Sequence, residues 1–165
     1  MIDISKIDVN TLELIKEVSK SRKEYVIPLI YTNDTISAYD VIECTHGKML
    51  SSESFVCIID PSLVPNMIAQ FHNHPGEINV FISTQDMIIY DKFNVPLIIG
   101  GKKEIKLFEL KFQNTFKDDL ENLKEIQDNV LENLSLGKPI EDHLRDRYRN
   151  TYERTLSNLN ITEII

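Results

Sequence analysis

The segment "QFHNHPGEINVFISTQDM", residues 70–87, has an order and spacing of polar residues that need an explanation. It places His72 and His74 at the end of a strand-like run, and Ser83 and Asp86 at the start of a helix-forming segment. Residues two apart on a strand point to the same face, so both imidazoles face one side of the sheet. The proline that follows cannot donate a ladder hydrogen bond, so the strand ends there. The pattern predicts a strand, a loop, and a helix whose first turn carries a carboxylate.

The donor types in this stretch indicate a metal site. The helix needs only to pack beside the strand to bring the carboxylate of Asp86 near His72 and His74. Two histidines and one carboxylate, with an open fourth position, form a ligand set of catalytic zinc. Bound Zn²⁺ lowers the pKa of its water from about 15.7 to about 7, which supplies hydroxide at neutral pH. Such a site would hold one Zn²⁺ per chain, with a bound water.

The same residues also fit a purely structural interpretation. The segment "STQD", residues 83–86, is a capping box with Ser83 as N-cap and Asp86 at the third helical position. Both residues could then serve only to start the helix, and two histidines beside a turn need no further explanation. The spacing alone leaves the metal site and the capping box open.

Hydrophobic periodicity elsewhere predicts an α/β protein built around one sheet. We expect helices at 7–24 and 83–93, and strands at 25–31, 36–44, 55–60, 68–74, 95–101 and 104–112. Asn10 or Thr11 could cap the first helix. Pro28 indicates that the first strand lies at an edge or carries a bulge.

The sequence changes character after Asn114, where it becomes charged and helix-forming. Two helices are expected there, at about 116–134 and 140–158. We therefore divide the chain into a domain over 1–114 and a helical C-terminal extension over 115–165.

The composition limits the classes of function. The formal net charge of -8 repels nucleic-acid phosphates and disfavours general DNA binding. Cys44 and Cys57 each lie in an apolar run, so we expect two buried thiols rather than a disulfide or metal ligands. A basic-then-apolar leader is absent, and no apolar run approaches the ~20 residues of a membrane helix. We expect a cytoplasmic protein without membrane contact.

The motif resembles the signature of one enzyme family. "HNHP" (72–75), seven residues, and then "STQD" (83–86) match His-x-His-Pro-(x)₇-Ser-x-x-Asp without insertion or deletion. That pattern is typical of the JAMM (MPN+/JAB) zinc metallopeptidases, which include deubiquitinases. The resemblance covers roughly residues 8 to 112. It implies a cytidine-deaminase-like (JAB/MPN) sandwich, in which helices flank a mixed sheet.

The resemblance also implies a role for each residue. His72, His74 and Asp86 would hold the zinc. The family carries a glutamate near the start of the first strand, and Glu24 stands at that place. It would act as general base and then as general acid, taking a proton from the water and giving it to the leaving amine. Ser83 would donate a hydrogen bond to the oxyanion of the tetrahedral intermediate.

The sequence departs from the family after the glutamate. There the family often has Glu-x-x-Gly-x-Leu-x-Gly, whereas this chain has Ile27, Leu29 and Tyr31, so only the leucine matches. The strand must therefore carry larger side chains. Other carboxylates that could take the acid–base role are Asp40, Glu43 and Glu77.

The implied function is zinc-dependent hydrolysis of an isopeptide or peptide bond at the C-terminal tail of a ubiquitin-like or sulfur-carrier protein. An extended tail could add as a strand beside the sheet. RadC-like JAB proteins with a DNA-associated role form an alternative, but they usually carry Ser-Gly where this chain has Gly76-Glu77. A second alternative is a non-catalytic MPN scaffold. The sequence indicates no oligomeric state.

Overall fold

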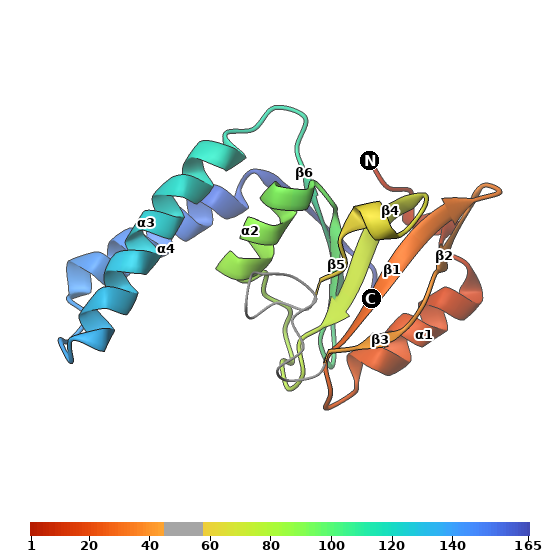
Figure 1. Cartoon of the computed structure of the whole chain (residues 1–165), viewed down its shortest axis with the longest axis horizontal. Helices are drawn as coiled ribbons and strands as arrows, with labels where there is room; N and C mark the ends of the chain where they lie inside the picture. Colours follow the sequence, from red (N-terminus) through yellow and green to blue (C-terminus); the bar gives the residue numbers. More distant parts are fainter. Residues whose placement is uncertain (45–57) are drawn as a thin grey trace. The chain divides into compact units, whose positions relative to one another are not determined.

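The computed structural model describes residues 1–44 and 58–165 (Figure 1). Its described part holds four α-helices: α1 (Val9–Ser19), α2 (Thr84–Phe93), α3 (Phe116–Ser135) and α4 (Asp142–Leu156). The strands are β1 (Tyr25–Thr32), β2 (Thr35–Ala38), β3 (Ile42–Glu43), β4 (Met67–Asn73), β5 (Leu97–Gly100), β6 (Ile105–Leu110) and β7 (Leu159–Glu163). Two 3₁₀ turns lie at Ile4–Lys6 and Pro61–Leu63. The expected α/β class is confirmed.

The strands form one mixed sheet in the order β2-β1-β4-β5-β6-β7, with β3 also paired to β1. Strand β4 pairs antiparallel with β1 and parallel with β5. Parallel neighbours need a crossover connection, and here the connection from β4 to β5 runs through α2. Residues 70–87 therefore supply the end of a central strand and the first turn of its crossover helix.

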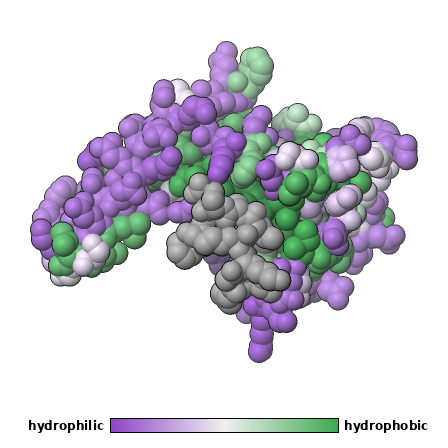
Figure 2. All heavy atoms as spheres, in the orientation of Figure 1, coloured by the Kyte–Doolittle hydropathy of each residue, from purple (hydrophilic) through white to green (hydrophobic). Residues whose placement is uncertain are grey.

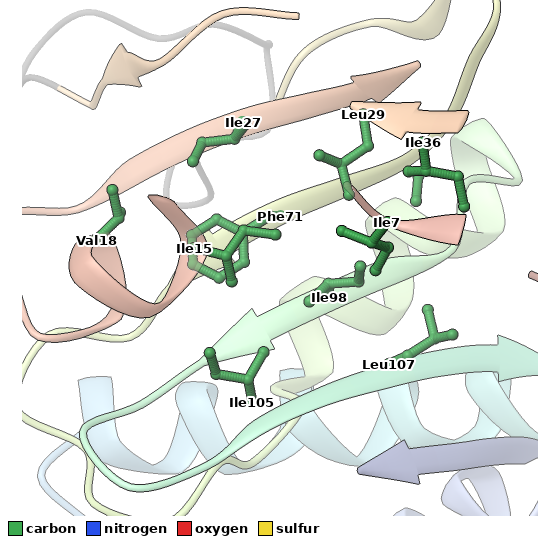
Figure 3. Packing of buried hydrophobic residues seen from close by; sticks show 11 residues of the cluster. Ile7, Ile15, Val18, Ile27, Leu29, Ile36, Phe71, Ile98, Ile105 and Leu107 are labelled. Carbon is green, nitrogen blue, oxygen red and sulfur yellow. The ribbon is translucent and has the colours of Figure 1, made fainter. Parts of the chain in front are cut away.

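Helix α1 covers one face of the sheet. Asp8 is its N-cap and accepts a hydrogen bond from the Thr11 backbone N–H at 2.7 Å, so the expected caps Asn10 and Thr11 are wrong. The helix ends at Ser19, earlier than predicted. Its apolar stripe buries residues of the main core together with Phe71 of β4 (Figure 3). That core contains Ile7, Ile15, Val18, Ile27, Leu29, Ile36, Ala69, Phe71, Ile98, Ile105 and Leu107.

Pro28 does not lie at an edge, and the irregularity in the pairing of β1 with β4 falls after it rather than at it. Strand β1 sits between β4 on one side and β2 and β3 on the other, and its register with β4 shifts between Leu29 and Ile30. The carbonyl of Pro28 accepts from Tyr39 N–H, so its backbone faces the gap between β2 and β3. A residue without an N–H is tolerated there because no continuous strand lies opposite. The same gap splits the strand that we expected over 36–44.

Two further expectations are corrected. The strand predicted at 55–60 is wrong for residues 58–60, which are in no strand, while 55–57 fall outside the described residues. Cys44 takes part in a disulfide bond, so the expected buried thiol is wrong at that position. Cys57 also lies outside the described residues. Whether two cysteines meet depends on tertiary structure, which an apolar run does not reveal.

Contacts divide the chain into two compact units, one of residues 1–109 with 161–165 and the other of residues 110–160. In the second unit, α3 and α4 lie close to the two expected helices and pack against each other. Their visible surface is mostly hydrophilic (Figure 2). A buried polar group anchors the base of α3, where Asn158 Nδ2 donates to Asp119 Oδ2 at 2.8 Å. Strand β7 was not predicted, and the boundary at residue 114 stays a prediction.

Among the described residues, we find no helix that combines the length and apolar character needed to cross a membrane.

The close approach of α1 to β5 gives a stability prediction. A Cβ at Gly100 would lie 2.1 Å from Ser19 Oγ and 2.8 Å from Phe71 Cε2. We expect Gly100→Ala to lower the free energy of unfolding by about 1–3 kcal/mol, because overpacking forces neighbours to shift. Urea denaturation measures this loss, and adding Ser19→Ala should recover part of it. An unchanged unfolding midpoint would contradict the close packing of α1.

Candidate metal centre

Successive side chains of β4 point to opposite faces of the sheet, so the core and the candidate site lie on different faces. Phe71 points to the α1 face, so His72 points to the opposite face of the sheet. Helix α2 lies on that second face, as Figure 1 shows, and Asp86 in its first turn meets the histidine there. His72 and Asp86 are each 2% exposed. His74, one residue beyond the end of β4, remains partly open to solvent.

The three side chains that we predicted as ligands converge. His72 Nε2 lies 3.1 Å from His74 Nε2 and 3.1 Å from Asp86 Oδ1. His74 Nε2 lies 3.3 Å from Asp86 Oδ2. Bonds of about 2.0–2.1 Å at tetrahedral angles put ligand atoms roughly 3.3 Å apart, so this donor set fits a zinc-sized ion. The group could hold a metal ion, and its geometry alone does not identify the metal.

The capping box is present as well. The Ser83 N–H donates to Asp86 Oδ2 at 2.9 Å, and the Asp86 N–H donates to Ser83 Oγ at 3.0 Å. A carboxylate has two oxygens, and here Oδ2 closes the cap while Oδ1 faces His72. The two interpretations of the sequence are therefore compatible, because the cap fixes the orientation in which the carboxylate meets the histidines.

Charge explains how the buried carboxylate is tolerated. Burial raises the pKa of Asp86, but the opposite effect of His72 and His74 is larger. The pKa of Asp86 is therefore held well below its usual range. Burial lowers the pKa of His74, whereas Asp86 and Glu77 raise it, with a net value of about 9. Without a metal ion, the site therefore holds a carboxylate beside a cationic imidazole.

Glu77 has a role that the sequence did not reveal. Its Oε2 lies 2.8 Å from His74 Nδ1, the ring nitrogen that faces away from the ligand group. A histidine ligand commonly donates its second N–H to a carboxylate, which fixes the ring and strengthens the ligand. The feature of the sequence that could have indicated this contact is the turn expected after Pro75. In the structure, the Glu77 N–H donates to the His74 carbonyl at 3.2 Å across that turn.

Glu24 and Ser83 line the same pocket as two of the predicted ligands, His74 and Asp86. The pocket has a volume of about 320 Å³ and is lined by Glu24, His74, Pro75, Glu77, Ser83, Gln85 and Asp86. The register pairs Val26 with His72, and its continuation places Glu24 opposite His74 on the same face. The glutamate expected from the resemblance is therefore close to the predicted ligands.

The other candidates lie elsewhere. The Asp40 carboxylate accepts from the Val41 backbone N–H, and the Glu43 carboxylate lies 3.3 Å from Lys23 Nζ. Neither belongs to the described lining of the pocket. His143 is an exposed residue of α4, and His46 falls outside the described residues.

No protein-family model and no curated protein matches the chain.

The contact of Glu77 with His74 gives a prediction about metal affinity. We expect Glu77→Gln to weaken Zn²⁺ binding about 10–100-fold, because the ring loses its charged partner. Competition with a chromophoric chelator measures the affinity. Glu43→Gln is the matched control, since that carboxylate lies on β3 beside Lys23, and it should bind as the wild type does. Unaltered affinity in Glu77→Gln would show that the contact does not support the ligand.

The raised pKa of His74 predicts how the stability of the metal-free protein depends on pH. A histidine pKa raised from 6.5 to about 9 contributes stability that is fully present below pH 6.5. That contribution is lost as pH rises through about 9. With a chelator present, the free energy of unfolding should fall from neutral pH toward pH 10. His74→Asn should show a smaller fall, and equal slopes in both proteins would contradict the prediction.

Proposed function

We propose that the chain is a zinc-dependent metallopeptidase of the JAMM type with a JAB/MPN fold. Its substrate would be an isopeptide or peptide bond at the C-terminal tail of a ubiquitin-like or sulfur-carrier protein. The observation that carries the proposal is convergence in space. Glu24 and the motif residues His74, Ser83 and Asp86 line one pocket, although Glu24 is far from the others in sequence.

The fold supports the same proposal. A first helix, a His-x-His strand in the middle of a mixed sheet, and a crossover helix opened by Ser83 follow the element order that the resemblance implies. Helices α1 and α2 flank the sheet on opposite faces (Figure 1). The family's glycines after the glutamate are replaced here, yet Ile27 and Leu29 are accommodated because both are fully buried in the α1-side core.

The residues divide the chemistry among them. His72, His74 and Asp86 would hold the zinc, which when bound supplies Lewis acidity and an activated water. The carboxylate of Glu24 would accept a proton in the pocket and return it to the leaving amine, so that the amine departs neutral. The Ser83 Oγ accepts from the Asp86 N–H, which leaves its hydroxyl proton to donate to a developing oxyanion.

The alternatives differ in observable ways. A non-catalytic scaffold needs no complete donor set, whereas here all three ligand positions are filled and converge. A RadC-like role with DNA is disfavoured by the net charge of -8, which repels phosphates. It is also disfavoured by Gly76-Glu77, which stand where those proteins usually have Ser-Gly. The peptidase proposal therefore accounts for more of the observed site.

The experiment that tests the proposal compares wild type with Glu24→Gln. We expect about one zinc per chain in both proteins, measured by elemental analysis, because Glu24 is not among the proposed ligands. Hydrolysis of a ubiquitin-like protein with a fluorogenic amide after its C-terminal Gly-Gly should fall about 10²–10⁴-fold in the variant, since it lacks the acid–base group.

Controls separate this outcome from indirect effects. Glu43→Gln, a carboxylate outside the described pocket lining, should keep wild-type turnover. Chelation should abolish hydrolysis in the wild type, and added zinc should restore it. Full turnover in Glu24→Gln would remove that residue from the mechanism, and a wild type that binds no zinc would favour the scaffold.

A further inference from the structure

We propose that Asn73, the residue between the two histidines, is a positioning residue that holds Glu24 at the pocket. The anchoring of the backbone around Glu24 is independent of the enzymatic proposal, whereas the consequence for turnover rests on it. Asn73 would touch neither substrate nor metal, and it would act through the glutamate.

Asn73 brackets Glu24 with two hydrogen bonds. Its Oδ1 accepts from the Tyr25 N–H at 2.7 Å, and its Nδ2 donates to the Lys23 carbonyl at 2.8 Å. The side chain is 0% exposed. Both atoms of one buried amide are therefore used to hold the residues immediately before and after the glutamate.

The backbone pairing of β1 with β4 ends before Glu24, so a side chain is needed to attach this segment to β4. The pairing of β1 with β4 stops at Val26 opposite His72, so backbone pairing does not reach Glu24. The amide of Asn73 offers one acceptor and one donor, as a peptide unit does, and it continues the attachment beyond the last ladder pair. The position of Glu24 relative to β4 is then set by this amide.

A third hydrogen bond holds the backbone of Glu24 from the side of β3. The Glu24 carbonyl accepts from the Cys44 N–H at 2.9 Å, next to the pairing of β1 with β3. With this bond and the two to Asn73, the backbone of residues 23–25 is held from both neighbours. A buried amide side chain is costly unless it is fully hydrogen-bonded, so Asn73 favours this one arrangement.

The same strand offers a matched control. Gln70 is also a buried amide on β4, and it brackets Ile59 by accepting from its N–H and donating to its carbonyl. Replacing Gln70 removes the same kinds of bond at a distance from Glu24. Comparing the two residues therefore separates a general loss of stability from displacement of the glutamate.

The first test concerns the anchoring itself. In Asn73→Ala, amide hydrogen exchange at Tyr25, followed by NMR, should accelerate at least about tenfold because the N–H loses its acceptor. In Gln70→Ala, the protection of Tyr25 should stay at the wild-type level. Zn²⁺ affinity should change little in either variant. Wild-type protection of Tyr25 in Asn73→Ala would overturn the proposal.

The second test concerns catalysis on the fluorogenic Gly-Gly amide. Asn73→Ala should lower kcat about 10²-fold with a nearly unchanged KM, the size of effect expected for displacing a reacting group by about 1 Å. Gln70→Ala should retain kcat in its folded fraction. In the Glu24→Gln background, Asn73→Ala should cause no further loss, because the group that it positions is already absent. Equal losses in Asn73→Ala and Gln70→Ala, or fully additive losses in the double variant, would overturn the proposal.

The design distinguishes two kinds of failure. A zinc-loaded wild type that hydrolyses no amide would refute the proposed function, while exchange at Tyr25 would still decide whether Asn73 anchors this segment. If Asn73→Ala does not fold, Asn73→Ser keeps a short polar group but cannot bridge both backbone groups. It should show the same faster exchange at Tyr25, and protection equal to wild type would again overturn the proposal.

Discussion

The site depends on one buried charge, the carboxylate of Asp86. An ionised carboxylate away from water is costly unless it is paired and hydrogen-bonded. Here the backbone N–H of Ser83, the N-cap of α2, donates to Oδ2, and the positive end of the helix dipole favours negative charge at that place. His72 and His74 complete the compensation. These polar contacts thus hold helix α2 against the end of strand β4.

Strand β4 serves the core and the site at once because its side chains alternate. Phe71 fills the core under α1, while His72 on the next position faces α2 and the pocket. Asn73 then returns to the α1 side and reaches the backbone around Glu24. A shift of one residue in the register of this strand would exchange these environments completely, so the pairing that stabilises the sheet also sets the geometry of the site.

The sequence predicts the arrangement of residues that are close together in the chain, but it does not predict contacts between distant residues. His72, His74, Ser83 and Asp86 lie within fifteen residues, and strand alternation plus helix capping largely determine their arrangement. Glu24 is 48 residues before the nearest predicted ligand, His72. Its place therefore depends on the register of β1 with β4, and it was expected only from the resemblance. Strand β7, the gap opposite Pro28 and the disulfide at Cys44 depend likewise on tertiary neighbours that periodicity does not identify.

The capping box and the candidate metal centre share one carboxylate, that of Asp86. The cap orients the Asp86 carboxylate through backbone hydrogen bonds, so the start of α2 itself sets the direction in which this group faces the histidines. The raised pKa of His74, about 9, means that a proton neutralises part of the cluster in the metal-free protein. A metal ion would replace that proton with a larger positive charge at nearly the same place. That cation would lie on the α2 face of the sheet, because the apolar core under α1 contains none of the predicted ligands.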